Sequence, residues 1–420
     1  MQEGFKAVMS SHFDTLCVIG LGYIGLPTAV VFAERGIHVH GVDIKPESIE
    51  AINRGEAPFV EQSLAKHLSK MVQAKRLVAS LEPVKADATI ISVPTPFHAD
   101  HSADLSYIES AAASIAPVLY PGALVVLEST SPPGTTEKLS DWIAEARPDL
   151  VDSGELMVDI VHCPERVLPG QVLTELVTND RIVGGLSPRA SDRGKALYEI
   201  ICTGQILETD AKTAEMSKCV ENSFRDVNIA FANELSIICD RLGIDVWELI
   251  KLANHHPRVN ILNPGPGVGG HCLAVDPWFI VAADPEDARI IRLARETNDA
   301  KPMWVAKKVE DAVAGIAAPS IAALGLAFKP DIDDLRESPA LHVAEILARE
   351  FPHGHILAVE PNVSHLPKEL AILPNVDLVD YSTALENADS VVLLVDHKEF
   401  LQRPVLREGV TVVDTRGVWH

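Results

Sequence analysis

The sequence feature that most constrains the fold is an alternation of short apolar runs, rich in β-branched residues, with polar or amphipathic segments. Strands that alternate with helices in this way favour a parallel, doubly wound sheet with helices on both faces. The first part of the chain holds five such runs, at Thr15–Gly20, Val39–Val42, Thr89–Val93, Leu124–Leu127 and Met157–His162. A second series closes the chain, at Ser320–Leu326, Ile356–Val359, Ser390–Val395 and Val410–Val413. We therefore predict an α/β fold with two doubly wound domains.

A long helix is expected between the two series, over Ala211–Leu242. Its apolar residues recur at helical spacing, as Val220, Phe224, Val227, Phe231, Leu235 and Ile238. Such a stripe is typical of a packing face, here either a spine between the two domains or a dimer interface. The prediction is thus two Rossmann-like domains joined by a long central helix. Its domains are 1–208 for the first α/β domain, 209–305 for the helical region and 306–420 for the last α/β domain.

Charge and cysteine content narrow the function classes. The chain has 420 residues, and 59 acidic against 36 basic side chains give a formal charge of −23. Such a surface repels phosphate backbones and anionic lipid, so we expect neither nucleic-acid binding nor membrane association. The longest uncharged stretch, Ala111–Leu127, is interrupted by Pro117 and Pro121, which argues against a membrane-spanning helix. Six cysteines without CxxC pairs and no signal-peptide pattern favour a reducing, cytoplasmic setting.

A glycine-rich turn follows the first predicted strand. Gly20, Gly22 and Gly25 form a GxGxxG motif, with Tyr23 and Ile24 between its last two glycines. Such glycines allow a tight turn and close approach of the backbone to a pyrophosphate, and the helix that follows favours the anion. Asp43 ends the next strand, where a carboxylate can accept hydrogen bonds from a ribose diol but repels a 2′-phosphate. We therefore predict NAD as the cofactor.

Hydroxyl-bearing turns follow two later strands of the same predicted sheet. Thr95 lies in the first of them, and Thr130 and Thr136 lie in the second. Ligands of doubly wound sheets bind at the carboxyl ends of strands, so these hydroxyls are candidate cofactor contacts. Turns of this composition are also common without any function.

The sharpest chemical feature is Cys272, which follows four glycines in the stretch 265–270. A helix that begins at the cysteine would favour its thiolate and would bring Asp276 one turn on, so Cys272 is a candidate nucleophile. On the long helix, Lys218, Asn222 and Arg225 share a face about 200° from the start of the apolar stripe. That face is either a solvated polar surface or part of a site.

Several further polar groups lie in unusual segments. Glu165 follows a predicted strand, and His256 with Arg258 precedes the glycine loop. Two adjacent histidines at 255 and 256 lack a third ligand at a suitable spacing, so we predict no metal. Lys329 and Arg336 follow the first strand of the last domain, where cations could bind phosphates.

Together these segments resemble the UDP-glucose/GDP-mannose dehydrogenase family over nearly the whole chain. The resemblance rests on GLGYIGLP, VPTP, ESTSPPGT, CPERVLPG, TAEMSKCVENSFRDVNIAFANEL, NHHPRVNILNPGPGVGGHCLAVDPWFI and GLAFKPDIDDLRESPA. HPRVN with GPGVGGHC, and CPERVLPG, are most similar to its UDP-N-acetyl-D-mannosamine dehydrogenase branch.

The resemblance implies oxidation of a sugar C6 alcohol to a carboxylate with two NAD⁺, on a UDP-sugar, by a homodimer formed through the central helix. It implies catalytic roles for Cys272, Lys218, Glu165, Asn222 and Asp276, and a cofactor contact for Arg336. The substrate contacts that it implies are Arg166, Val167, Lys218, Asn222, Arg225, His256, Arg258, Gly269 and Lys329.

Alternatives remain open. The same chemistry on UDP-N-acetylglucosamine, UDP-glucose or GDP-mannose would use the same residue types. A non-catalytic NAD-binding redox sensor, in which Cys272 is a regulatory thiol, is a hypothesis of another class. A hydroxy-acid dehydrogenase fits less well, because it needs neither the cysteine nor a second nucleotide domain.

Overall fold

The computed structural model describes residues 13–59, 61, 63–98, 100–167, 170–270 and 272–419. The chain forms two compact units, Met1–Val220 and Glu221–His420, and the long helix α8 (Ala211–Leu242) crosses the boundary. Each unit is described separately below. The predicted division into three segments, 1–208, 209–305 and 306–420, stays a prediction.

The first unit is built on an eight-stranded sheet in the order β10-β9-β8-β5-β4-β1-β2-β3. All neighbouring strands are parallel except β8 and β9, which are antiparallel. The five strands predicted here are confirmed, whereas β3, β9, β10 and the antiparallel pair were not predicted. The strands are β1 (Thr15–Ile19), β2 (His38–Val42), β3 (Leu77–Ser80), β4 (Ala88–Ile91), β5 (Leu124–Leu127), β8 (Asp159–His162), β9 (Arg181–Gly185) and β10 (Ile206–Asp210), with a small hairpin of β6 (Val151–Asp152) and β7 (Glu155–Leu156).

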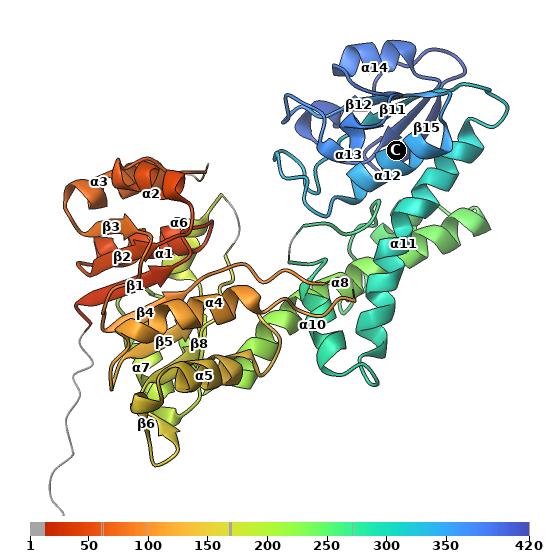
Figure 1. The fold of residues 1–420 in the computed structure, drawn as a ribbon. Helices are drawn as coiled ribbons and strands as arrows, with labels where there is room; N and C mark the ends of the chain where they lie inside the picture. Colours follow the sequence, from red (N-terminus) through yellow and green to blue (C-terminus); the bar gives the residue numbers. More distant parts are fainter. Residues whose placement is uncertain are drawn as a thin grey trace, which may run out of the picture. The chain divides into compact units, whose positions relative to one another are not determined.

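Helices cover both faces of this sheet (Figure 1). One buried apolar cluster joins the sheet to α1 (Gly25–Glu34), α2 (Pro46–Asn53), α3 (Leu64–Gln73), α6 (Val172–Thr178) and α7 (Pro188–Tyr198). A second cluster packs the opposite face against α4 (Ser106–Ile115) and α5 (Thr135–Ala146), which are accompanied by 3₁₀ turns at Ala116–Val118 and Pro148–Leu150. Two separate cores on one mostly parallel sheet are what a doubly wound domain requires.

The second unit begins with helices. Most of α8 is joined by α9 (Val246–Ala253), α10 (Asp276–Ala283) and α11 (Arg289–Ala312). The predicted helix Ala211–Leu242 is confirmed to the residue. Its apolar stripe is exposed, however, with Phe224 68% and Phe231 53% accessible. The buried face of α8 instead carries polar residues, including Asn222, Asp226 and Asn233.

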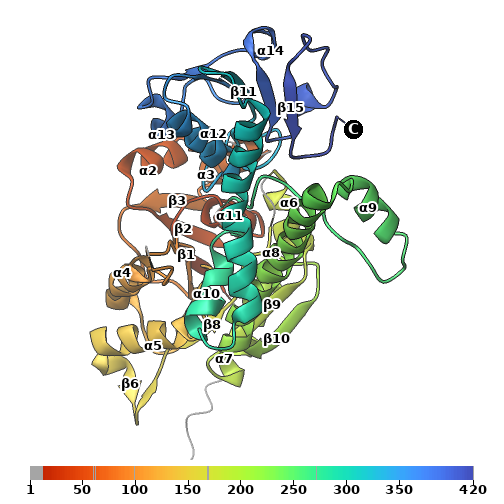
Figure 2. The ribbon, with the colours of Figure 1, turned by 90° about the vertical axis from the view of Figure 1, so that its right-hand side faces the viewer.

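A five-stranded parallel sheet, β13-β12-β11-β14-β15, completes the second unit (Figure 2). One face packs on α11 and α12 (Pro339–Glu350), with α13 (Lys368–Ala371) alongside, and the other packs on α14 (Tyr381–Asn387). The four strands predicted here are confirmed, and β13 is an addition. The strands are β11 (Ser320–Leu324), β12 (His355–Val359), β13 (Val376–Leu378), β14 (Ser390–Leu393) and β15 (Thr411–Asp414), and a 3₁₀ turn lies at Lys398–Phe400.

Within the part of the chain that the structure describes, no helix is both long enough and apolar enough to cross a lipid bilayer.

Candidate active site

The glycine turn after β1 is held by the sheet itself. Gly20 has a φ of +91°, and its N–H donates to the carbonyl of Val42 at 2.8 Å. A Cβ on Gly20 would lie 2.4 Å from the carbonyl oxygen of Ser92, and one on Gly25 would lie 1.8 Å from that of Gly20. Nothing lies within 4 Å of a Cβ built on Gly22. Gly20 and Gly25 are therefore required by the turn, while the backbone at Gly22 is open to a ligand.

Asp43 is oriented by two backbone groups. Its Oδ2 accepts from the N–H of Leu21 at 3.0 Å and its Oδ1 from that of Lys45 at 3.0 Å. The carboxylate is half-buried, and each oxygen keeps lone-pair capacity for a further donor. Beside the turn, Tyr23 is exposed and stacks on Phe59 with ring centroids 4.3 Å apart.

The three predicted threonines differ. Thr95 is buried, and its hydroxyl has no hydrogen-bond partner among the described residues. Thr130 is half-buried. Thr136 is buried, and its hydroxyl donates to Glu215 Oε1 at 2.6 Å, so a cofactor contact there would require that bond to be exchanged. The open backbone at Gly22, the aligned Asp43 and the unsatisfied hydroxyl of Thr95 fit a dinucleotide.

Glu165 is buried in the first unit, just beyond β8. Its Oε2 pairs with Arg181 at 2.9 Å, and its Oε1 accepts from the N–H of Arg166 at 2.7 Å. The half-buried Arg166 donates to the carbonyl of Asp180. Val167, also half-buried, packs against the apolar core. Glu165 is thus a fixed carboxylate.

Lys218 and Asn222 are one turn apart on α8. Lys218 is half-buried, whereas Asn222 is buried and its Nδ2 donates to Asp276 Oδ2 at 2.5 Å. Arg225 is exposed. The polar face predicted on this helix is therefore partly buried, and its amide is linked to the segment that carries the cysteine.

Cys272 is exposed, and its carbonyl accepts from the N–H of Asp276 at 2.9 Å. The expected helix start at Cys272 is wrong, because α10 begins at Asp276. Pro277 accounts for the difference, since proline is accommodated in the first turn of a helix and clashes in its interior. The turn nevertheless joins the backbone of Asp276 to that of Cys272, and the carboxylate of Asp276 accepts a hydrogen bond from Asn222.

The other cysteines are poor nucleophile candidates. Cys17, Cys163, Cys219 and Cys239 are buried and Cys202 is half-buried. For Cys163, burial raises the pKa of the thiol to about 12, with a smaller opposing effect of Arg181. A thiolate is the reactive form of cysteine, so the exposed Cys272 is the better candidate.

The two ends of the cysteine loop are tied to α8 and α11. The N–H of Gly265 donates to Asn233 Oδ1 at 2.9 Å, and Arg295 Nη1 donates to the carbonyl of Leu273 at 3.4 Å. Arg295 is itself buried against Asp226 at 2.6 Å. These bonds explain why α8 buries polar residues: the buried network fixes the loop in place.

The glycines of the loop are required by close packing within the second unit. A Cβ on Gly269 would lie 2.4 Å from the carbonyl oxygen of Glu337, and Gly270 has a φ of +84°. The N–H of Gly270 donates to the carbonyl of Arg336 at 3.1 Å. The predicted substrate contact at Gly269 would therefore be made by its backbone.

Three cations of the C-terminal domain are candidate ligand contacts: Lys329 and Arg336, both predicted, and Arg416, which was not. Lys329 and Arg336 are exposed, and Arg336 is paired with Asp334 at 2.6 Å. Arg416 lines a small hollow together with Gly267 and Phe328, and pairs with Asp396 at 2.9 Å. No sequence motif had singled it out.

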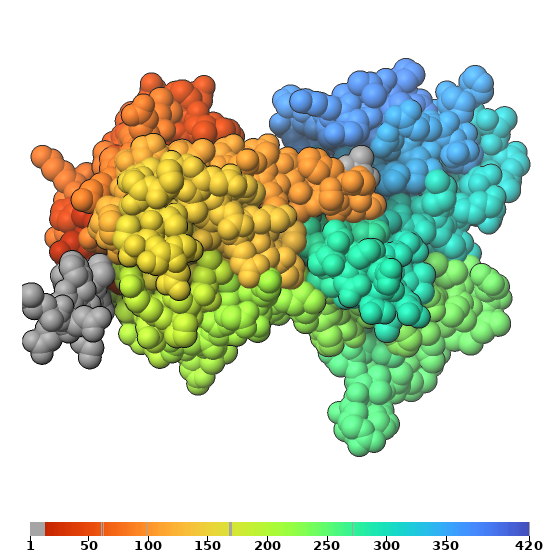
Figure 3. All heavy atoms as spheres, turned by 60° about the horizontal axis from the view of Figure 1, so that its bottom comes forward, coloured from red at the N-terminus to blue at the C-terminus, as the bar shows by residue number. Residues whose placement is uncertain are grey.

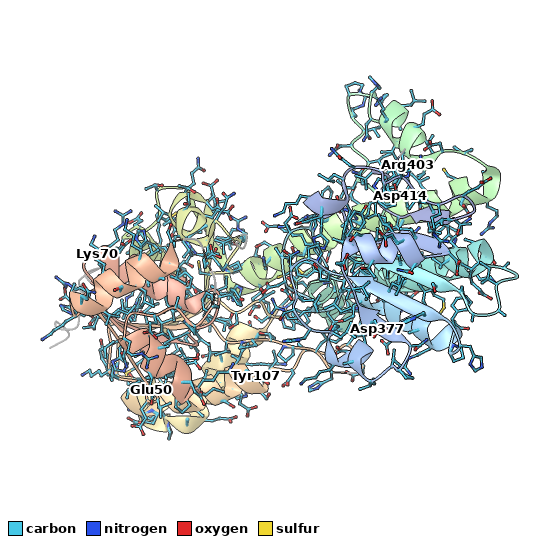
Figure 4. All side chains as sticks on the ribbon, turned by 90° about the horizontal axis from the view of Figure 1, so that it is seen from above. Glu50, Lys70, Tyr107, Asp377, Arg403 and Asp414 are labelled. Carbon is cyan, nitrogen blue, oxygen red and sulfur yellow. The ribbon has the colours of Figure 1, made fainter. Side chains whose placement is uncertain are left out.

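A capping carboxylate holds the segment that carries Arg416. Asp414, at the end of β15, accepts from the N–H groups of Arg416 and Gly417, both at 2.8 Å. Asp414 also accepts from the N–H of Trp419 at 2.8 Å, and Arg403 donates to the carbonyl of Trp419 at 3.0 Å. Figure 4 labels Asp414 and Arg403. The C-terminal segment is therefore a built part of this domain.

His256 and Arg258 lie on the loop after α9, which projects from its unit (Figure 3). Both are exposed. The loop is closed by Asn254, whose side chain donates to the carbonyl of Ile261 at 3.0 Å and accepts from its N–H at 2.7 Å. A projecting loop with a rigid base can present these side chains outward.

Family models match along the chain in three parts. Residues 14–202 match the NAD-binding domain, 212–300 the central domain and 322–420 the UDP-binding domain of the UDP-glucose/GDP-mannose dehydrogenase family. The chain belongs to this family. It is an NAD-dependent nucleotide-sugar dehydrogenase, and NAD is the cofactor that the glycine turn and Asp43 predicted.

Individual relatives of this chain are named as dehydrogenases of particular nucleotide sugars. The chain is 56% identical to a UDP-N-acetyl-D-mannosamine dehydrogenase of Yersinia pestis, over 97% of this chain and 100% of that one. It is 54% identical to an NDP-N-acetyl-D-galactosaminuronic acid dehydrogenase of Ralstonia nicotianae, over 97% and 96%. Among solved structures, a UDP-D-ManNAc dehydrogenase of Pyrococcus horikoshii matches with a TM-score of 0.86 at 37% identity, over 97% and 96%.

Proposed function

We propose that this enzyme oxidises UDP-N-acetyl-D-mannosamine at C6 to UDP-N-acetyl-D-mannosaminuronate, with two NAD⁺ and one water per sugar. The observation that carries the chemistry is the exposed thiol of Cys272, at the start of a turn whose far end, Asp276, is bonded to Asn222. The sugar is inferred from the named relatives, of which the Yersinia pestis protein is 56% identical. Bound NAD⁺ supplies the hydride acceptor in both oxidations.

The first oxidation removes a hydride from C6 and a proton from its hydroxyl. Lys218, with Asp276 and a water, is the proposed acceptor of that proton. The Asn222–Asp276 hydrogen bond at 2.5 Å fixes the acid beside α8. The product of this step is an aldehyde.

The Cys272 thiolate then adds to the aldehyde carbon, and the new oxyanion takes up a proton to give a thiohemiacetal. Loss of a second hydride from that carbon, with loss of the hydroxyl proton, gives a thioester. Lys218 and Asn222 stabilise the oxyanions. Covalent retention of the aldehyde lets one enzyme carry out both oxidations.

Water hydrolyses the thioester and releases the carboxylate and the thiol. Glu165, held by Arg181 at 2.9 Å and by the N–H of Arg166, is the proposed group that orients this water and accepts its proton. The sum is one alcohol, two NAD⁺ and one water converted to one carboxylate, two NADH and three protons.

Cations and backbone groups are proposed to hold the UDP-sugar. They are Arg166, Val167, Arg225, His256, Arg258, Gly269 and Lys329, with Arg336 toward the cofactor. Arg416 is a further candidate, because it lines the hollow beside the glycine loop. Guanidinium groups suit a diphosphate because they donate two parallel hydrogen bonds.

We propose a homodimer through α8. Its apolar stripe leaves Phe224 68% and Phe231 53% exposed on a helix of 32 residues, and a second copy would cover the same stripe on both protomers. Sedimentation of Phe231→Glu should then give a monomer where the natural chain gives a dimer.

The cytoplasm is the proposed compartment, because NAD⁺ and nucleotide sugars are made and used there.

The substrate test is a panel of nucleotide sugars read by NADH absorbance. UDP-N-acetyl-D-mannosamine should give the highest kcat/KM. The second candidate substrate is a nucleotide-linked N-acetylgalactosamine, favoured by the 54% identity to the Ralstonia nicotianae protein. A higher kcat/KM with that substrate would replace the first assignment. UDP-N-acetylglucosamine, UDP-glucose and GDP-mannose complete the panel, and NAD binding without turnover of any sugar would favour the redox sensor.

A further inference from the structure

Behind Glu165 lies a buried cluster of polar groups that the reaction scheme does not use. Glu128 directly follows β5 and is 3% exposed, and Tyr198, at the end of α7, is fully buried. Tyr198 Oη donates to Glu128 Oε1 at 2.6 Å. The second oxygen of Glu128 has no hydrogen-bond partner among the described residues.

Arg181 links this pair to Glu165. Its guanidinium is 3% exposed, donates to Glu165 Oε2 at 2.9 Å and lies over the Tyr198 ring at 4.7 Å from the centroid. Sheet register explains the grouping, because β5 and β8 are neighbours and the N–H of Cys163 donates to the carbonyl of Leu127. Glu128 and Glu165 thus lie beyond the ends of adjacent strands, and Arg181 is paired with Glu165 and acts electrostatically on Glu128.

Charge balance favours a neutral Glu128. Two buried carboxylates with one guanidinium would carry a net negative charge at low solvent exposure, which is costly. Glu165 has the ion pair, so Glu128 is the group that gains from holding a proton. Burial raises the pKa of Glu128, the charge of Glu165 raises it further, and Arg181 and the Tyr198 hydrogen bond oppose the rise.

The other surroundings of Glu128 do not alter this balance. The charged or titratable groups that act on it in the described residues are Glu165, Arg181 and Tyr198. The neighbouring Cys163 is a neutral thiol, because burial raises its pKa to about 12. From α1, the ring of Phe32 packs on Tyr198.

We propose that Glu128, acting through Tyr198 and Arg181, is a positioning residue that keeps Glu165 an oriented carboxylate and holds an exchangeable proton beside it. The inference rests on the proposed role of Glu165 in hydrolysis. While Glu128 is neutral, Arg181 is committed to Glu165. When Glu128 loses its proton, it competes for the same guanidinium and its charge acts on Glu165.

Infrared titration of the full chain tests the proton directly, without any dependence on turnover. The natural protein should show one carboxylic acid C=O band that disappears on raising the pH through the neutral range. Glu128→Gln should lack it, and Glu145→Gln, an exposed control on α5, should keep it. Absence of a neutral-range titration in the natural protein, or its persistence in Glu128→Gln, would overturn the proposal.

Two further variants give the direction of coupling. Tyr198→Phe removes a hydrogen-bond donor that favours the ionised form of Glu128, so the midpoint of the Glu128 titration should rise by about one pH unit. Glu165→Gln removes a negative charge, so the midpoint should fall. A titration midpoint that moves in neither variant would contradict the coupling of Glu128 to Tyr198 and Glu165, even where Glu128→Gln fails to fold.

The kcat–pH profile then connects the proton to the reaction. Glu128→Gln should keep kcat within about twofold at pH 6 and lose the neutral-range inflection, with KM unchanged. Loss of kcat at every pH with KM unchanged would indicate a different role for Glu128. If infrared shows the proton and Glu165→Gln hydrolyses the thioester normally, the proposed role of Glu165 fails while the buried proton remains.

Discussion

The two α/β domains have the same kind of turn after their first strand, but the two turns have different roles. Gly20 and Gly325 have φ values of +91° and +90°, and each donates its N–H at 2.8 Å to the last residue of the next strand. In each domain the following leucine donates its N–H to an acid at the end of that next strand. Asp43 is the acid in the first domain, at 3.0 Å, and Glu360 is the acid in the second, at 2.8 Å.

The difference lies in what else reaches the acid. Asp43 is half-buried and is followed by an exposed residue. Glu360 is 4% exposed and also accepts from the N–H of Ala327, from His397 at 3.0 Å and from Asn362. One acid is aligned with capacity left for a ribose, and the other is fully used by its own domain. Similar strand-end acids can therefore bind a ligand or stabilise a fold, depending on the donors around them.

The largest expected effect is that of Gly25→Ala. The new Cβ would lie 1.8 Å from the carbonyl oxygen of Gly20, so the turn must open. We expect NAD affinity to fall by about 100-fold and the free energy of unfolding by about 1–3 kcal/mol. Calorimetric titration with NAD⁺ and urea unfolding measure the two, and normal affinity would refute the turn geometry.

Gly22→Ala separates the ligand from the fold. No atom lies within 4 Å of the added Cβ, so the free energy of unfolding should not change, while NAD affinity should fall by roughly tenfold because the methyl group occupies ligand space. The same titration checks it. An affinity equal to that of the natural chain would mean that the dinucleotide does not approach Gly22.

Exchanging each acid for its amide tests the comparison itself. Asp43→Asn should weaken NAD binding by about fivefold to tenfold and reduce discrimination against NADP. Its loss of stability should be smaller than that of Glu360→Gln, because only two backbone N–H groups of the described residues donate to the half-buried Asp43. Glu360→Gln should leave NAD binding unchanged and lower the free energy of unfolding by about 1–2 kcal/mol. The reverse pattern would show that the two domains had been assigned the wrong roles.

The smallest effect is on acid stability. Burial raises the pKa of Glu360, but hydrogen bonds from His397 and backbone N–H groups outweigh it and lower the pKa to about 2. A lowered folded-state pKa means that this stabilisation is complete above the unfolded value of about 4.3 and is lost as the pH falls toward 2. Urea unfolding between pH 5 and 2 measures how steeply the free energy of unfolding changes with pH. In Glu360→Gln this change should be less steep, by up to one proton.

Much of the fold could be predicted because it is encoded locally. Nine strands and α8 follow from apolar periodicity, and the glycine turn follows from residues adjacent in sequence. One exception depends on a contact distant in sequence, and another is local. The antiparallel direction of β9 is set by pairing with β8, and the start of α10 was misjudged because Pro277 was not weighed against the cysteine.

The site was predicted only in part. Cys272, Asn222 and Asp276 are local in sequence or on one helix face, and the structure does bring Asn222 and Asp276 together. Arg181, Tyr198 and Arg416 carry no motif and reach their places through packing. The apolar stripe of α8 left two alternatives open, a spine between the domains or a dimer interface, because periodicity indicates that a face is covered and not whether this chain covers it.

The most direct test of the proposed reaction is the NADH yield with limiting UDP-N-acetyl-D-mannosamine and excess NAD⁺. The natural enzyme should give two NADH per sugar, because the aldehyde stays bound to Cys272 until the second oxidation. Cys272→Ser should stop after the first oxidation or before formation of an ester, and so give at most one. One NADH per sugar from the natural enzyme, or two from Cys272→Ser at an undiminished rate, would contradict the mechanism.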